Sequence, residues 1–268
     1  MNGKARAGGT LGFMKVTVCE LNDDQRALAS EWNGLVAHVR DAQSELVLLP
    51  EMPFYPWWMS DAQVDPAVWD AAVASHQSWK PRLKELCTPC ILSTFPTTCA
   101  GERSNEGFLW ENERYVPVHQ KYFLPNEAGF WESTWCSRGN GTFSVASSGA
   151  CNCGFLICTE LWSFETARDY GRAGAHLVIT PRSSLLTTRD KWLVAGRAAA
   201  IVGGVFALSS NRCGVSRDGI EFGGEGWIID PDGTVLGVTS RTTQFVTIDI
   251  DLDKAVRAKG TYPRDVFM

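Results

Sequence analysis

The sequence predicts an α/β protein built on a mixed sheet, and two observations lead to this prediction. Short apolar runs alternate with segments of helical periodicity along most of the 268 residues, a pattern typical of helices layered on a sheet. Residues 224–239 place strand-like runs on both sides of the sequence PDG, which predicts a hairpin and therefore antiparallel strands. A chain of this length fits a single domain, which we place at residues 14–268.

In the first half of the chain, the elements follow from the spacing of apolar residues. Residues 1–13 are Gly-rich and polar, so we expect a flexible extension there. Leu28, Trp32, Leu35 and Val39 recur at helical spacing. The predicted elements are a strand at 14–21, a helix at 23–42, a strand at 45–50, a helix at 66–87, a strand at 90–96 and two strand-like runs within 107–124.

In the second half the same alternation continues up to the hairpin. The predicted elements are a strand at 151–160, a helix at 163–175, a strand at 176–181, a helix at 189–203, a strand at 204–212, the hairpin at 224–239 and a last strand at 244–252. Residues 254–268 have mixed composition, and we expect them to form an extended C-terminal arm that could contact a partner subunit.

Composition excludes several classes of function. The net charge is −5 and the lysines and arginines are not clustered, so we expect no nucleic-acid partner and no anionic membrane. No apolar stretch reaches the roughly 18–20 residues that span a bilayer. The nine cysteines are irregularly spaced and no signal-peptide pattern is present, which favours free thiols in the cytoplasm.

Three ionisable residues stand at the ends of apolar strand-like runs. Glu51 follows LVLLP, Lys121 follows RYVPVHQ, and Cys158 follows GFLI. In α/β folds such strand ends are where catalytic residues gather. A glutamate can act as general base toward a thiol, a lysine can offset negative charge that develops during attack, and the thiol can act as nucleophile.

The local context of these residues resembles the carbon–nitrogen hydrolase, or nitrilase, superfamily with its Glu–Lys–Cys set. LVLLPEMPF resembles the glutamate motif, HQKYFLP the lysine motif, and GFLICTELWSFETARDYGRAGAHLVITPRSS the cysteine motif with the helix and strand that follow. GRAAAIVGGVFALSSNRCG and FGGEGWIIDPDG fit the downstream pattern. The resemblance covers residues 14–252, nearly the whole chain.

The resemblance implies an αββα sandwich whose subunits pair so that sheets stack across an interface, in a homodimer or higher homo-oligomer. It implies Glu51 as general base, Lys121 as the cation beside the tetrahedral intermediate, and Cys158 as nucleophile. The sequence KYFLPNEAGFWESTW is closest to the ureido-cleaving branch, which selects Glu132 as a second glutamate, with Glu127 as the other candidate.

The same resemblance implies that the N–H of Thr159 donates into an oxyanion hole. The implied reaction is hydrolysis of an amide or carbamoyl C–N bond through a thioester, without cofactor or metal. A nitrile substrate and a catalytically silent binding protein of the same fold are the alternatives. A thiol-redox protein is a third class, which requires a resolving cysteine beside Cys158. Cys87 and Cys90 form a CxxC, but no second CxxC completes a zinc site.

Residues for substrate recognition are less clearly marked. Arg182 follows the strand HLVIT and could hold a substrate carboxylate, or it could lie at a surface or subunit interface. Trp57 and its aromatic neighbours Phe54, Tyr55 and Trp58 follow Glu51 directly, so they could form a wall of the pocket. These residues predict a substrate with a sizeable apolar or aromatic body. His119 could assist in the pocket or be a hydrogen-bonded strand histidine.

Overall fold

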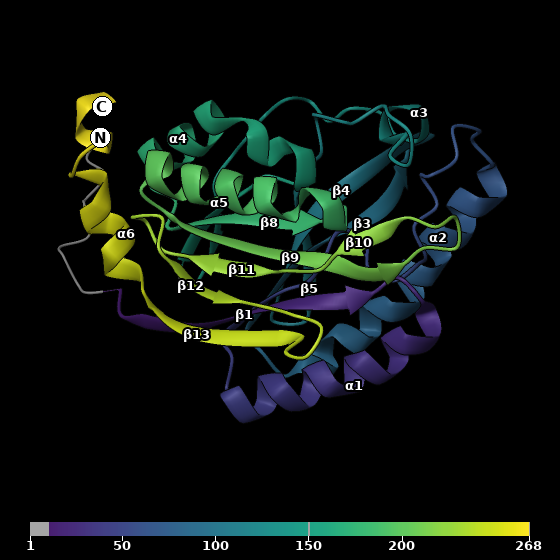
Figure 1. Ribbon diagram of the computed structural model, residues 1–268, viewed down its shortest axis with the longest axis horizontal. Coiled ribbons are helices and arrows are strands. Elements are labelled where there is room, and N and C mark those ends of the chain that lie inside the picture. Colours follow the sequence, from purple (N-terminus) through teal and green to yellow (C-terminus); the bar gives the residue numbers. More distant parts are fainter. Residues whose placement is uncertain (1–10, 150, 268) are drawn as a thin grey trace.

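The computed structural model describes residues 11–149 and 151–267, and their strands form two sheets that meet along β1 (Figure 1). The first sheet has the order β13 (Phe245–Asp251), β1 (Phe13–Asn22), β2 (Leu46–Leu48), β3 (Cys90–Cys99), β4 (Glu102–Glu111), β5 (Arg114–Gln120). The second has the order β6 (Ala146–Ser148), β7 (Cys151–Phe155), β8 (Leu177–Arg182), β9 (Phe206–Val215), β11 (Trp227–Ile229), β12 (Val235–Val238), with β10 (Glu221–Gly223) on the end of β9.

Both sheets are mixed, as the hairpin predicted. The strands β1, β2 and β3 run parallel, whereas β4, β5 and β13 are antiparallel to their neighbours. In the second sheet β7, β8 and β9 are parallel, and β11 and β12 form the predicted hairpin. The end of β1 pairs with β9, and this pairing joins the two sheets.

Helices cover the outer face of each sheet. The helices are α1 (Gln25–Ala42), α2 (Pro66–Trp79), α3 (Glu132–Trp135), α4 (Phe164–Arg172), α5 (Arg189–Gly203) and α6 (Leu252–Lys259), with short 3-10 helices η1 (Lys80–Leu86), η2 (Cys158–Trp162), η3 (Leu186–Thr188) and η4 (Arg264–Phe267). The carboxylates of Asp24 and Asp65 cap α1 and α2 by accepting from backbone N–H groups two residues later. α1 packs on the first sheet, and α4 and α5 pack on the second.

The alternation of side chains along the strands separates the layers of the core. Val16 and Leu46 of the first sheet belong to one buried cluster with Phe155 and Ile179 of the second. Val47, the neighbour of Leu46, turns the other way into the cluster beneath α1. The four layers of the predicted αββα sandwich are therefore completed within one chain. Whether sheets also stack across a subunit interface stays a prediction.

Two segments differ from their predicted secondary structure. The strand predicted at 151–160 ends at Phe155, and Cys158 begins a 3-10 helix. The C-terminal segment is helical rather than extended, because Leu252, Ala255 and Ala258 bury one face of α6 and Asp251 caps its first turn. Residues 1–10 of the predicted N-terminal extension lie outside the described residues, whereas Phe13 begins β1 and pairs with Asp251.

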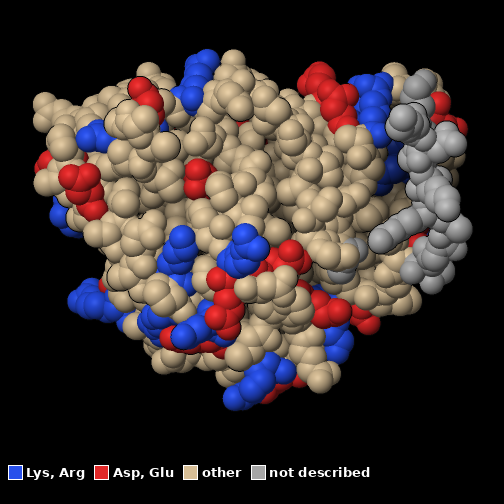
Figure 2. Space-filling view, turned by 180° about the vertical axis from the view of Figure 1, so that it is seen from behind, with Lys and Arg blue, Asp and Glu red and all other residues tan. Residues whose placement is uncertain are grey.

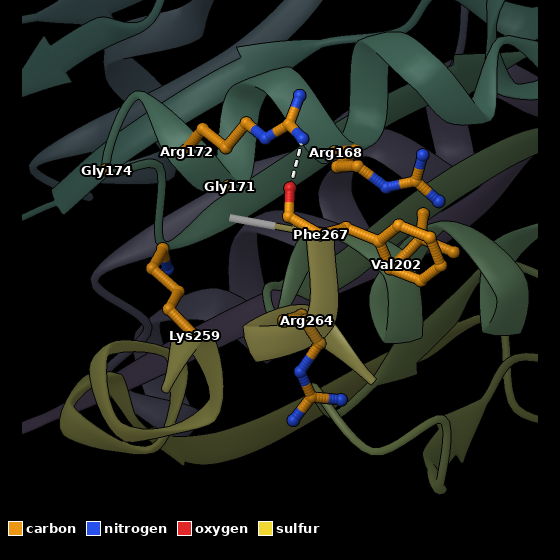
Figure 3. A pocket seen from close by; sticks show the side chains of 9 residues that line it. Arg168, Gly171, Arg172, Gly174, Val202, Lys259, Arg264 and Phe267 are labelled. Atoms are coloured by element: carbon orange, nitrogen blue, oxygen red, sulfur yellow. Dashed lines mark hydrogen bonds between the residues drawn. The ribbon is translucent and has the colours of Figure 1, made fainter. Parts of the chain in front are cut away.

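The C-terminal segment packs back on α4 (Figure 3). Arg172 donates to the carbonyl oxygen of Phe267, and the guanidinium of Arg168 lies 4.8 Å from the centre of the Phe267 ring. These contacts fix η4 against the same subunit, and whether it also contacts a partner stays a prediction.

Charged groups on the surface are mixed in sign. Figure 2 shows acidic and basic side chains interleaved along the lower part of one face, below a broad area with few charges. Among the described residues, no helix has the length and apolar character needed to cross a bilayer.

Candidate active site

The structure brings Glu51, Lys121, Glu132 and Cys158 together at the ends of strands. Glu51 lies three positions after β2, Lys121 directly follows β5, and Cys158 lies three positions after β7. Glu132 begins the short helix α3. All four side chains are buried, so the surrounding sheets rather than solvent determine their charge states.

Lys121 is the centre of the group. Its Nζ donates to Oε1 of Glu51 at 2.8 Å and to both carboxylate oxygens of Glu132 at 2.7 Å. An ammonium group has three protons, so these contacts use all of its donors. Glu132 is therefore the second glutamate that bonds Lys121. The other candidate, Glu127, is exposed and lies on the rim of the neighbouring cavity.

The charge states follow from burial and from these pairings. Burial lowers the pKa of Lys121, but the carboxylates of Glu132 and Glu51 outweigh this effect and raise its pKa well above the usual value. Burial, with a smaller contribution from Glu51, raises the pKa of Glu132 to about 7 although Lys121 opposes the shift. Lys121 therefore stays cationic at neutral pH, and Glu132 titrates near neutrality.

Glu51 has one carboxylate oxygen engaged and one without a hydrogen-bond partner. Oε1 accepts from Lys121 and from Nδ2 of Asn105, the latter at 2.8 Å. Oε2 is buried, and no partner is recorded for it among the described residues. A buried carboxylate oxygen in this state is a ready proton acceptor. Sequence reasoning missed Asn105, a polar residue on β4 that is buried beside this group.

The thiol of Cys158 is buried beside Glu51 and Lys121. Burial and the charge of Glu51 raise the pKa of its thiol, whereas Lys121 and a hydrogen bond from the Ser183 backbone lower it. The thiol is therefore protonated at rest. Its backbone φ is 46°, in the left-handed region that costs a non-glycine residue about 1–3 kcal/mol. This conformation turns the chain sharply at Cys158.

Glu160 connects the segment of Lys121 to the segment of Cys158, a role that the sequence did not predict. Its Oε1 accepts from the N–H of Tyr122 at 2.7 Å, and its Oε2 accepts from the N–H of Ile157 at 2.8 Å. His119 Nε2 lies 2.8 Å from the same Oε2 and is buried. His119 is therefore a hydrogen-bonded strand histidine, and Glu160 connects the neighbours of Lys121 and Cys158.

The loop after Glu51 is fixed from the second sheet. Arg212 Nε donates to the carbonyl oxygen of Glu51 at 3.2 Å, and its Nη1 donates to Oδ1 of Asp23. Oδ1 of Asp23 also accepts from the N–H of Trp57 at 2.8 Å. Both Asp23 and Arg212 are buried, so this ion pair positions the backbone that holds Glu51 and turns the following loop.

A cavity of about 190 Å³ opens at Cys158. Its lining includes Cys158, Glu132, Thr159, Ser183, Phe130 and Trp162. Thr159 lies at the amino end of η2, where the first N–H groups of a helix have no partner within the helix. A smaller cavity of about 120 Å³ beside η4, drawn in Figure 3, contains none of these residues.

Trp57 does not line the Cys158 cavity, contrary to the sequence prediction. It is buried behind Phe130, with ring centres 5.5 Å apart, and its Nε1 donates to the carbonyl oxygen of Gly129 at 2.9 Å. Phe54 packs in the core beneath α1. The contact of the Trp57 backbone with Asp23 turns this loop away from the thiol, so the aromatic wall comes from other segments.

Arg182 lies neither on the surface nor in the cavity. It is buried, and its guanidinium donates to Ser209 Oγ, Ser184 Oγ and the carbonyl oxygen of Glu225, each at 2.7 Å. Its charge also lies 3.9 Å from the centre of the Trp227 ring. Because all three nitrogens are engaged, the arrangement does not provide the carboxylate hold that the sequence suggested.

Within residues 11–149 and 151–267, no group of three or more His, Cys, Asp or Glu side chains has a geometry suited to a metal ion. The cysteines at positions 87 and 90 are both free thiols.

Comparison with known proteins identifies the family of this chain. Residues 15–259 match the Carbon-nitrogen hydrolase family. The chain belongs to this family. Among curated relatives, it is 26% identical over 170 residues to Nitrilase homolog 2 of Dictyostelium discoideum, covering 61% of this chain and 52% of that protein. It is 31% identical over 109 residues to an (R)-stereoselective amidase of Pseudomonas sp, covering 41% and 40%. The matches thus span about half or less of these relatives.

Solved structures of the nitrilase superfamily share the fold. A carbon-nitrogen hydrolase from Helicobacter pylori G27 superposes with a TM-score of 0.84 at 19% identity, over 96% of this chain and 95% of that chain. A variant of an amidase from Nesterenkonia sp. AN1 superposes at 0.73 and 19% identity, over 94% and 96%. That variant has the acetamide moiety of fluoroacetamide added covalently at its active-site cysteine.

Proposed function

We propose that this carbon–nitrogen hydrolase cleaves an amide or carbamoyl C–N bond through a thioester on Cys158. The proposal rests on the hydrogen bonding of the Glu51 carboxylate. One oxygen is held by Lys121 and Asn105, and the other is buried and unpartnered in a site that also holds a protonated thiol. This is the arrangement that general-base activation of a nucleophile needs.

In the first half-reaction Glu51 accepts the thiol proton as sulfur attacks the carbonyl carbon. The carbonyl oxygen becomes an oxyanion, toward which the N–H of Thr159 donates. Lys121 acts through its charge rather than a hydrogen bond, because its three protons are held by Glu51 and Glu132. Glu51 then returns the proton to the leaving nitrogen, the C–N bond breaks, and ammonia or an amine departs.

In the second half-reaction Glu51 takes a proton from water as the water oxygen attacks the thioester carbon. The C–S bond breaks, the proton returns to sulfur, and the acid is released with Cys158 restored. The covalently modified cysteine of the Nesterenkonia amidase variant supports the assignment of the nucleophile by analogy.

Replacement of the nucleophile tests the proposal. We expect Cys158→Ala to abolish ammonia release from primary amides and ureido acids, with circular dichroism and melting temperature close to wild type. The exposed Cys99 provides a matched control, and Cys99→Ala should keep full activity. An active Cys158→Ala enzyme would contradict the proposal.

The alternatives are separated by the same assay. Preferential ammonia release from nitriles would make the chain a nitrilase, since thioimidate chemistry uses the same residues. Ligand binding without turnover of any C–N substrate would make it a silent binding protein.

A further inference from the structure

The cavity at Cys158 has polar and apolar parts. Glu132, Thr159 and Ser183 line it together with the thiol, whereas Phe130, Leu185, Trp162 and Trp192 provide apolar lining. The apolar residues come from four different segments of the chain, so the apolar wall is a feature of the fold and not of one loop.

Trp162 is the unusual member of this wall. Its side chain and backbone together are 44% exposed, although tryptophan is a residue that folding normally covers. Its ring lies 5.3 Å from that of Trp192 at 51° and 6.5 Å from that of Phe164. An aromatic surface that lines a reactive cavity and remains uncovered is available to a ligand.

Trp192 provides the rigid support for Trp162. It is buried, its Nε1 donates to Thr188 Oγ1 at 3.1 Å, and the Arg182 guanidinium lies 5.7 Å from its ring centre. The buried Arg182, in turn, is held by three hydrogen bonds. Trp162 therefore rests on a fixed surface and can receive a planar group.

The volume of the cavity and the charges that line it further restrict the class of ligand. A cavity of about 190 Å³ is smaller than the roughly 300–1,000 Å³ of sites for drug-sized ligands, so it fits a compact group. The exposed side chains of Glu127 and Lys191 also line it, one acidic and one basic. Their charges oppose each other, and the carboxylate of Glu132 is paired with Lys121, so these groups give no net preference for an ionic substrate.

We propose that the substrate carries a compact, uncharged and planar apolar group, about one aromatic ring in size, on its acyl side, and that this group packs against Trp162. The inference rests on the proposed hydrolase function and deepens it. It makes Trp162 a specificity-determining residue, distinct from the bond-breaking set of Glu51, Lys121 and Cys158.

Steady-state kinetics with phenylacetamide, acetamide and the anionic succinamate test this proposal. We expect wild type to favour phenylacetamide over acetamide, and Trp162→Ala to raise KM for phenylacetamide about tenfold or more while KM for acetamide changes less than about twofold. Trp162→Phe should restore much of the preference. Tyr262 is a matched exposed aromatic outside the cavity, so Tyr262→Ala should leave both values unchanged.

Equal effects on the two amides, or a wild-type preference for succinamate, would overturn the proposal. It would also be overturned if Trp162→Ala changed the molecular mass in solution without changing the ratio of KM values, because Trp162 would then belong to a subunit contact.

Protection of Cys158 from iodoacetamide, followed by intact mass, separates this proposal from the proposed function. Protection by phenylacetamide but not by acetamide, with no turnover of either, would refute the hydrolase function and support the aromatic pocket. Turnover of both amides with equal protection would support the hydrolase and refute the pocket.

Discussion

Removal of the Glu160 carboxylate is expected to damage both the stability and the chemistry of the site. In Glu160→Ala the N–H groups of half-buried Tyr122 and buried Ile157 lose an acceptor that is itself fully buried. Each unsatisfied buried group costs about 1–3 kcal/mol, so the free energy of unfolding should fall by roughly 2–6 kcal/mol. Glu160→Gln keeps the volume and one acceptor oxygen, and it should lose about half as much.

The effect on catalysis follows from the position of these N–H groups. Tyr122 is the neighbour of Lys121, and Ile157 is the neighbour of Cys158. A displacement of about 1 Å at reacting groups can reduce turnover about 10²-fold, so kcat of Glu160→Gln should fall by up to that factor with a smaller change in KM. Glu160 is a positioning residue in this account, because it acts through its neighbours.

The assay combines urea denaturation with kcat and KM for a primary amide and with the rate of iodoacetamide labelling of Cys158. Glu165 is a nearby exposed glutamate on α4, so Glu165→Gln is the control and should match wild type. If Glu160→Gln kept wild-type kcat and stability, the coupling between the lysine and cysteine segments would be refuted.

Three further outcomes are expected. Burial raises the pKa of Glu132 from 4.5 to about 7, so its stabilising contribution is present below pH 4.5 and is lost as the pH rises through 7. Between pH 5 and 8 the free energy of unfolding of wild type, measured in urea, should therefore fall by up to about 3 kcal/mol more than that of Glu132→Gln. Parallel plots of unfolding free energy against pH for the two proteins would contradict this. Asn105→Ala removes a hydrogen bond to charged Glu51 worth about 1.5–3 kcal/mol, so kcat should fall roughly 10–100-fold, and an unchanged kcat would refute its role. Arg182→Leu should lower the melting temperature without a selective loss of activity on substrates that carry a carboxylate. Such a selective loss would support the sequence prediction that Arg182 holds a substrate carboxylate.

Prediction from sequence succeeded where a local pattern determines the position of a side chain. Glu51, Lys121 and Cys158 each follow an apolar strand, and the packing of the two sheets brings the ends of these strands together. The β11–β12 hairpin and α5 were likewise predicted from turn residues and from the alternation of strands and helices.

The walls of the cavity depend on contacts between distant segments, which spacing does not reveal. Trp57 is close to Glu51 in the sequence, but Asp23, held by Arg212, binds its backbone and turns it behind Phe130. Arg182 ends a strand that is buried along its whole length, so its guanidinium is held by hydrogen bonds inside the protein. Trp162 follows the nucleophile closely, yet its half-exposed state is set by Trp192 on another helix.

The proposed catalytic residues come from both halves of the sandwich. Glu51 and Lys121 follow strands of the first sheet, Cys158 follows a strand of the second, and Arg212 of β9 holds the Glu51 carbonyl across the junction. Neither half alone contains both the proposed nucleophile and the proposed base. Catalytic activity therefore requires that the two sheets be packed together. A partly folded chain with only one sheet formed would be inactive, because the thiol would not yet lie beside its base.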